Sequence, residues 1–359
     1  MTLDGIGDVL TWVGDTRMID NLDDEIVRRT EESWRARAGA AAEEAIVRLG
    51  PEGLRRVLRA PEVTRRLLFH STAPSDPMAF MSQAVDVELA LADEGPPPQV
   101  STWSALGDVV MHPDGTTTWW PQLDRRPSPA LDFGSPWASH IDLSGRFEYV
   151  HVDRIGFSDD ELYAVHRMIT RAMASVEALS ASLGTFVSRS TCVLVLQVDP
   201  DAPNQVASGT NGNYIGRSFI TNPHHPDASI DCLVEAIVHE AIHGLLYRDS
   251  CGKPWVSGDA AVEVPRVTSP WTGRELPVRS FLEATFVWFG LVHLWALACK
   301  SEIFGYEAAR QRLTRSVSGF TRGSLVDRVH PWAHEIRPEV VQAVDDLQGR
   351  VVDALVGRP

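Results

Sequence analysis

The residues best suited to chemistry are His239, Glu240 and His243, which have the spacing HExxH. Residues four apart on an α-helix are separated by about 40° around the axis, so both imidazoles can face one metal ion. Glu240 would lie beside that ion, where it can take a proton from metal-bound water or hold a water or substrate group in place. The motif therefore predicts a metal site with His239 and His243 as ligands and Glu240 as the catalytic residue.

The segment around the motif predicts the helix that carries it. Residues 233–247 read LVEAIVHEAIHGLLY, which is apolar almost all round, as in a helix that is buried on most sides. Buried imidazoles and a carboxylate are costly unless a metal or a hydrogen-bond network satisfies them. The alternative interpretation is a pair of core histidines with ordinary hydrogen bonds and a glutamate that caps a neighbouring group.

A third ligand is expected on a second buried helix, predicted over residues 278–300. Glu283 is the only acid in the apolar part of that helix, and His293, ten residues further on, is the alternative. Two histidines and one carboxylate can hold zinc in a hydrolase with one open position, or iron(II) in an oxygenase with several. The spacing does not separate these two metals.

Composition restricts the classes of partner. Of the 359 residues, 44% are hydrophobic and 23% charged, as in an ordinary globular protein. The formal charge of −15, with no run of Lys or Arg, disfavours nucleic acid and anionic membranes as partners. The start resembles no signal peptide, the apolar runs are interrupted before they reach membrane-spanning length, and the 4 cysteines show no CxxC spacing. A cytoplasmic location is therefore expected.

Three parts are predicted along the chain: an N-terminal helical region at 1–94, a β-rich Trp/Pro/Gly segment at 95–155, and an HExxH metal-binding catalytic domain at 156–359. The helical pattern from 23 to 69 is expected to break at Gly50-Pro51, with Arg and Glu on the outer face.

In the middle segment, strands are predicted at Val109-Val110, 116–120 and 147–152. Its tryptophans could form the core of a small β-rich subdomain or an aromatic cradle for a peptide or ring substrate. They are Trp103, Trp119, Trp120 and Trp137.

The predicted order before the motif is a long helix at 159–182 capped by Ser158, a strand at 192–198, a polar loop at 206–213 and a strand at 214–220. This order is expected of zincin-like catalytic domains, in which the strand before the helix can pair with an extended peptide.

After the motif, residues 249–277 are expected to form a long functional loop. The fold class is therefore α+β and mainly helical. A zincin-like HExxH helix is expected to pack on a second buried helix and a small sheet, beside an N-terminal helical region.

Four segments in this order carry a family resemblance: SGTNGNYIGRSFI, LVEAIVHEAIH, TSPW and FLEATFVWFGLVHLW. Together they resemble the HExxH-motif proteins associated with bacterial peptide natural-product clusters. Those proteins are iron(II)- and 2-oxoglutarate-dependent peptide β-hydroxylases. The match covers roughly residues 208–295, and the first 150 residues contribute little to it.

The resemblance implies that His239 and His243 are iron ligands and that the position of Glu283 supplies the third. The family more often has His there, so Glu makes the site more negative. This sequence also has Thr272 and Leu276 where the family pattern has arginines after the Pro-Trp pair.

Two other arginines near the Pro-Trp pair could bind 2-oxoglutarate in place of the missing family arginines. Arg274 and Arg279 are the candidates for bidentate pairing with the distal carboxylate of 2-oxoglutarate.

Three functional hypotheses follow. The leading one is iron(II)/2-oxoglutarate-dependent hydroxylation of an unactivated carbon in natural-product biosynthesis. Its substrate would be a peptide or amino-acid side chain, including a precursor or carrier-bound peptide. The rival is a zinc metallopeptidase with Glu240 as general base and the 214–220 strand as substrate holder. The third is a non-catalytic interaction module in which metal only staples the core.

Overall fold

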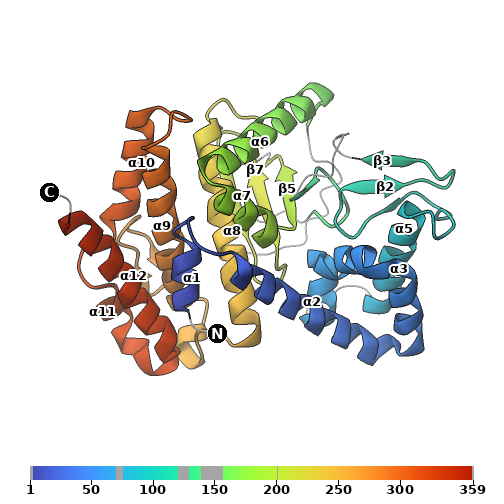
Figure 1. Cartoon of the computed structure of the whole chain (residues 1–359), viewed down its shortest axis with the longest axis horizontal. Helices are drawn as coiled ribbons and strands as arrows, with labels where there is room; N and C mark the ends of the chain where they lie inside the picture. The colour runs from blue at the N-terminus through green and yellow to red at the C-terminus, as the bar shows by residue number, and fades with distance from the viewer. Residues whose placement is uncertain (1–2, 70–75, 120–128, 139–156, 200, 358–359) are drawn as a thin grey trace. The chain divides into compact units, whose positions relative to one another are not determined.

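The computed structural model describes residues 3–69, 76–119, 129–138, 157–199 and 201–357. Within these residues the chain is mainly helical with small sheets (Figure 1), which confirms the α+β, mainly helical class.

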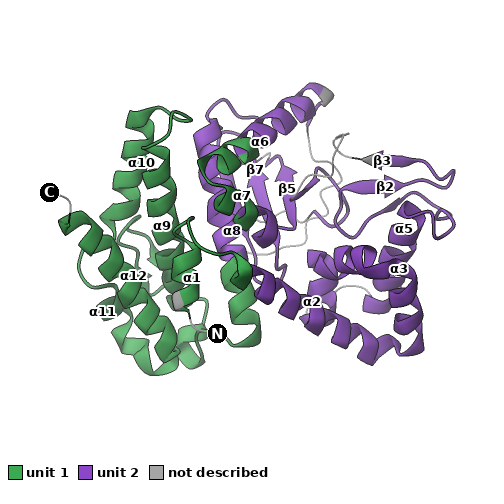
Figure 2. Cartoon of the chain, in the orientation of Figure 1, with its two compact units in different colours: residues 1–18, 173–186, 245–359 green, residues 19–172, 187–244 purple. Residues whose placement is uncertain are grey.

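The chain divides into two compact units that interleave along the sequence (Figure 2). Unit 1 comprises residues 1–18, 173–186 and 245–359, and unit 2 comprises residues 19–172 and 187–244. These boundaries do not follow composition, so the division at 94 and 155 stays a prediction about how the sequence is organised.

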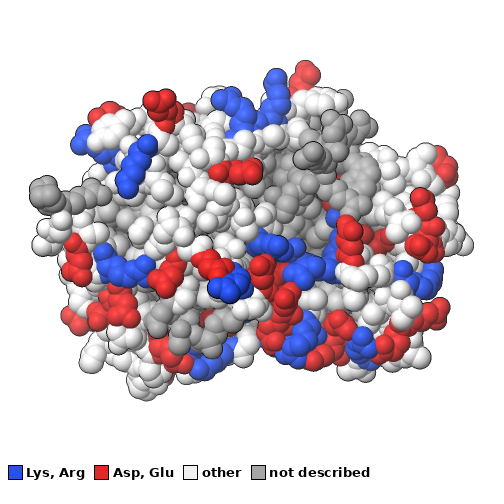
Figure 3. All heavy atoms as spheres, viewed as in Figure 1, with Lys and Arg blue, Asp and Glu red and all other residues white. Residues whose placement is uncertain are grey.

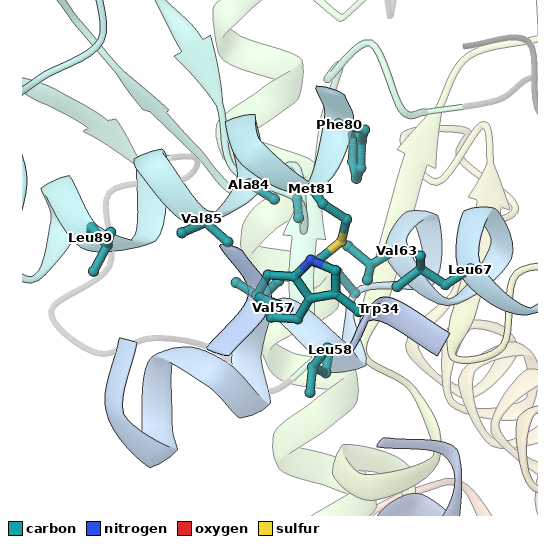
Figure 4. Close-up of a cluster of buried hydrophobic side chains, with 13 residues drawn as sticks. Trp34, Val57, Leu58, Val63, Leu67, Phe80, Met81, Ala84, Val85 and Leu89 are labelled. Carbon is teal, nitrogen blue, oxygen red and sulfur yellow. The ribbon is translucent and has the colours of Figure 1, made fainter. Parts of the chain in front are cut away.

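Unit 2 begins with four helices: α2 (Arg17–Ala38), α3 (Ala40–Arg59), α4 (Pro61–Leu68) and α5 (Pro77–Leu91). The chain breaks between α2 and α3 at Gly39, whose φ of 55° favours glycine. The break expected at Gly50-Pro51 is a kink inside α3. Figure 4 shows apolar side chains of these helices, among them Trp34, Val57 and Met81, that form one buried cluster of this unit.

The short helix α4 corrects one expectation. Glu62, Arg65 and Arg66 are buried, although Arg and Glu of this region were predicted to lie on the outer face. The guanidinium of Arg66 lies 4.3 Å from the centre of the Phe80 ring, and that of Arg65 lies 4.7 Å from the Tyr214 ring. Stacking on aromatic faces is a way to bury planar cations that hydrophobic periodicity does not reveal.

The middle segment holds an antiparallel sheet of β1 (Thr102–Trp103), β2 (Val109–Met111) and β3 (Thr117–Trp119). The strands predicted at 109–110 and 116–120 are thus found, with Trp120 outside the described residues, as is the strand predicted at 147–152. Trp137 packs edge-on against Phe80 at 4.8 Å and donates from Nε1 to the carbonyl of Ser104, which is a core role.

A four-stranded sheet forms the second part of unit 2, in the order β4-β5-β7-β6. Its strands are β4 (Ala130–Asp132), β5 (Val193–Gln197), β6 (Ala207–Thr210) and β7 (Arg217–Thr221). β4, β5 and β7 are parallel, and β6 pairs antiparallel with β7. The polar loop predicted at 206–213 therefore contains a strand, and that prediction was wrong there.

The strand predicted at 214–220 begins only at Arg217 and lies inside the sheet. Both of its edges pair, with β5 on one side and β6 on the other, so it has no free edge for a peptide. Among the described strands, β6 is the edge next to it. The Ser and Gly content of β6 predicted a loop instead of a strand, because such residues also mark loops.

Two helices lie between β4 and β5, namely α6 (Asp159–Leu179) and α7 (Ala181–Ser190), and α8 (Ile230–Gly252) follows β7. The predicted cap of α6 is present, because Ser158 and Glu161 bond reciprocally at the first turn. The predicted helix to residue 182 ends at Leu179, and α7 follows after Ser180. α8 carries the HExxH motif; its residues up to Gly244 belong to unit 2 and the rest to unit 1.

Unit 1 is built around α9 (Val278–Ala298), on which α1 (Asp4–Val9), α10 (Tyr306–Ser318) and α12 (Pro338–Val356) pack. α9 is the one helix among the described residues that is long and apolar enough to cross a membrane. However, 72% of its most apolar 18-residue window is buried inside the fold, so α9 is a core helix. α11 (Leu325–Val329) and the 3-10 helix η2 (His330–Glu335) precede α12.

The long loop predicted at 249–277 has structure of its own. It contains the end of α8, the 3-10 helix η1 (Gly258–Ala261) and the hairpin β8 (Val267–Thr268) and β9 (Glu275–Leu276). Trp271, in the turn of this hairpin, stacks on Trp288 of α9 at 5.7 Å and donates to the carbonyl of Ser316 at 2.8 Å. The Pro-Trp pair therefore anchors the hairpin to the core of unit 1.

Candidate metal centre

The two histidines lie on the most accessible stripe of a helix that is otherwise buried. Along α8, the half-buried positions Glu235, His239, His243 and Tyr247 follow one another at intervals of four residues. The apolar residues on the other faces are buried, as the sequence predicted. The side chain of His239 is 34% exposed, which leaves room for a ligand from outside the helix.

The separation of the imidazole rings suits a shared metal ion. The ring centroids of His239 and His243 are 5.1 Å apart, with the ring planes inclined by 47°. At a metal–nitrogen distance of about 2.1 Å each centroid lies about 3.2 Å from the ion, so rings at a tetrahedral angle have centroids about 5 Å apart. These two side chains therefore fit zinc or iron as a pair of nitrogen ligands.

Glu240 is buried beside the histidine stripe. It is 3% exposed, and its Oε1 accepts a hydrogen bond from the Ser208 hydroxyl of β6 at 2.7 Å. The same oxygen lies 3.9 Å from Nε2 of His239, which is too long for a hydrogen bond. The carboxylate is therefore held beside the histidine stripe by a neighbouring strand.

Glu283 lies on α9 in unit 1, whereas both histidines belong to unit 2. It is 5% exposed, and its Oε1 accepts from Nε of Arg279 at 2.8 Å, one helical turn earlier. Arg279 is thus a cationic partner for this buried carboxylate, so the burial of Glu283 does not by itself require a metal. Glu283 as third ligand stays a prediction.

The two arginines predicted to bind 2-oxoglutarate have different surroundings. Arg274 is exposed in the turn between β8 and β9. Arg279 is half-buried over the Tyr247 ring; burial opposes its charge, but the charge and hydrogen bond of Glu283 raise its pKa above the ordinary value. Arg279 is therefore a firmly charged group that already has one carboxylate partner, and Arg274 has the more open position.

His293, the alternative third ligand, sits on α9 in unit 1 against Phe289, with ring centroids 4.7 Å apart. Burial, helped by the charge of Arg350, lowers its pKa to about 4. Its imidazole is neutral at physiological pH, as a metal ligand must be, although it needs no metal to stay so.

The described residues contain no group of three or more His, Cys, Asp or Glu side chains that could hold a metal ion. The fit is therefore limited to the two histidines. Ser208 was noted in the sequence only as part of a family motif, and its bond to Glu240 has no signal in spacing, because 32 residues separate the two.

Comparisons with known proteins assign no family. No protein-family model matches the chain, and no curated protein matches it. The resemblance to the HExxH peptide hydroxylases therefore rests on the four sequence segments alone.

Proposed function

We propose that this chain is a metal-dependent oxygenase that uses iron(II) and 2-oxoglutarate to hydroxylate an unactivated carbon. The substrate is a peptide or amino-acid side chain, in the setting of bacterial natural-product biosynthesis and in the cytoplasm. The zincin-like arrangement of the HExxH helix beside a small sheet is part of the same proposal. His239 and His243 would hold the metal, with Glu283 as third ligand.

The observation that carries the proposal is the position of Glu240. A general base in a hydrolase needs a carboxylate that reaches the metal-bound water. Here the carboxylate is buried and accepts the Ser208 hydroxyl at 2.7 Å. That arrangement favours a residue that orients the site over one that exchanges protons with a substrate.

Each residue then has a distinct task. When bound, iron(II) would supply, with 2-oxoglutarate and O2, the oxidising chemistry needed to hydroxylate the substrate carbon. His239 and His243 hold their rings on the accessible stripe of α8, so substrate approaches from the side opposite the buried apolar residues. Glu240 fixes the polar surroundings of His239, and an arginine, with Arg274 the more open of the two candidates, would pair with the distal carboxylate of the cosubstrate.

A zinc peptidase is the second candidate, and β6 is the observation that favours it. β6 is antiparallel to β7, lies at an edge among the described strands, and reaches the motif through Ser208. An edge strand beside a metal helix can pair with an extended peptide through main-chain hydrogen bonds. In that case Glu240 would have to leave Ser208 to activate water.

Replacing Glu240 by Gln separates the two candidates. Glutamine keeps the shape and can still accept from Ser208, but it cannot act as a base. We expect Glu240→Gln to keep its metal and to retain measurable iron-dependent consumption of 2-oxoglutarate. Complete loss of activity with metal content unchanged would instead favour the peptidase.

A further inference from the structure

The hairpin of β6 and β7 turns one side chain toward the HExxH helix. Ser208 pairs with Ile220, and Gly209 pairs with Phe219. Because side chains alternate between the faces of a sheet, Ser208 and Gly209 face opposite ways. Ser208 thus shares a face with Thr210 and meets Glu240 of α8, while Phe219 packs on the other face with Val193 and Val195.

Close packing of β6 on β7 fixes the position of Ser208. A Cβ atom at Gly209 would lie 2.3 Å from the Phe219 ring, so only glycine lets that ring lie across the strand. At the closed end of the hairpin, the Thr210 hydroxyl donates to the carbonyl of Arg217 at 2.6 Å. Ser208 is therefore set in its register by the close packing of the adjacent Gly209 on the Phe219 ring.

The bond between Ser208 and Glu240 joins two segments far apart in the chain. A hydroxyl that donates to a carboxylate forms a charge-assisted hydrogen bond, which is stronger than a neutral one. The carboxylate that receives it is 3% exposed, so little water competes for the same oxygen. Without the hydroxyl, the Glu240 side chain could rotate, and its carboxylate would no longer be held in a single position beside His239.

We propose that Ser208 is a positioning residue of the metal site, which acts by holding the Glu240 carboxylate beside His239. This inference rests on the proposed function of α8 as the metal helix and deepens it. Residues that orient the surroundings of metal ligands typically contribute 10- to 100-fold to metal affinity. Ser208 contacts neither metal nor substrate in this account.

The test is anaerobic titration of ferrous iron, and separately of zinc, into the full-length chain and its variants. Ser208→Ala should raise the dissociation constant for metal by on the order of 10-fold. Ser208→Thr keeps a hydroxyl on a residue that favours strands and should restore most of the affinity. Thr210→Val, the matched control, loses one side-chain hydrogen bond of the same strand and should lower the thermal midpoint while metal affinity stays within about twofold.

A double-mutant cycle shows whether Ser208 acts through Glu240. If it does, Ser208→Ala should weaken metal binding no further in a Glu240→Ala background. Additive losses, or equal losses for Ser208→Ala and Thr210→Val, would overturn the inference and leave only a structural role. Full affinity in Ser208→Ala would overturn it alone, whereas a parent chain that binds neither iron nor zinc would overturn the proposed function as well.

Discussion

The buried Glu283 carboxylate has a cationic partner on its own helix. A buried carboxylate needs a cationic partner, and a metal was the nearest candidate that the sequence offered. The structure provides Arg279, at 2.8 Å and four residues earlier on the same helix. This pair could be predicted from the sequence, since residues four apart on a helix are neighbours. The sequence equally offers Arg279 as a partner for 2-oxoglutarate.

Substitution of Glu283 decides whether it also binds metal. If it is the third ligand, Glu283→Ala should weaken metal binding at least tenfold, while Glu283→His should largely preserve it, because imidazole can occupy the same coordination position. Isothermal titration with zinc measures both. Unchanged metal affinity in Glu283→Ala would mean that Glu283 only pairs with Arg279. His293 would then be the next candidate for the third ligand.

The histidine pair permits a more direct prediction. His239→Ala or His243→Ala should remove most bound metal and abolish any rise in thermal midpoint on adding metal, since binding free energy is also folding free energy. Elemental analysis of purified protein, with His225→Ala as a histidine control outside the motif, measures this. A full stoichiometric amount of metal bound to His239→Ala would contradict the assignment of His239 as a metal ligand.

At the scale of elements, the long periodic helices were predicted well and the short strands were not. Apolar positions at helical spacing fixed the existence of α8 and α9, and the Ser158 and Glu161 pair marked the start of α6. β6 has only four residues, all half-buried, so neither alternation nor an apolar run distinguished it from a loop. The sequence pattern did not predict the break at Gly39, because an isolated glycine is tolerated within helical patterns.

The β6 and β7 hairpin offers a packing test. Gly209→Ala places a Cβ 2.3 Å from the Phe219 ring and should destabilise the protein by about 1–3 kcal/mol. Gly53→Ala in α3 is the control: its Cβ would meet Leu49 at an ordinary 3.5 Å, and alanine favours helix by roughly 0.5–1 kcal/mol. Denaturant unfolding should separate the two variants; equal midpoints would contradict the close approach of Phe219.

His293 gives α9 a pH dependence of known sign. Its pKa falls from the ordinary value of 6.5 to about 4 in the fold, chiefly through burial, so the unfolded chain binds the proton more readily. The stability that this neutral imidazole contributes is present above pH 6.5 and is lost as pH falls from 6.5 toward 4. The total loss is on the order of a few kcal/mol.

Thermal unfolding at a series of pH values tests this. His293→Gln should show a shallower fall in midpoint between pH 6.5 and 4 than the parent chain does, because the variant lacks the titrating group. The carboxylates titrate alike in both proteins, so the difference isolates His293. Parallel curves would contradict a neutral, buried imidazole at this position.

Over the whole molecule, composition predicted the class and left the organisation open. The mainly helical α+β class followed from long amphipathic and apolar segments, whereas the interleaving of two units depends on contacts between distant segments that periodicity does not encode. The formal charge of −15 is carried by mixed surfaces; Figure 3 shows acidic and basic side chains interspersed over the face in view.

The proposed function of the whole chain rests on one property, which is iron-dependent use of 2-oxoglutarate. The most direct measurement is succinate formation from 2-oxoglutarate by protein purified without air, stripped of metal and reloaded with either ferrous iron or zinc. The account predicts succinate with iron in the presence of O2, none with zinc, and none from His239→Ala reloaded with iron. Protein that binds ferrous iron at the histidine pair yet forms no succinate, while its zinc form cleaves peptides, would contradict it.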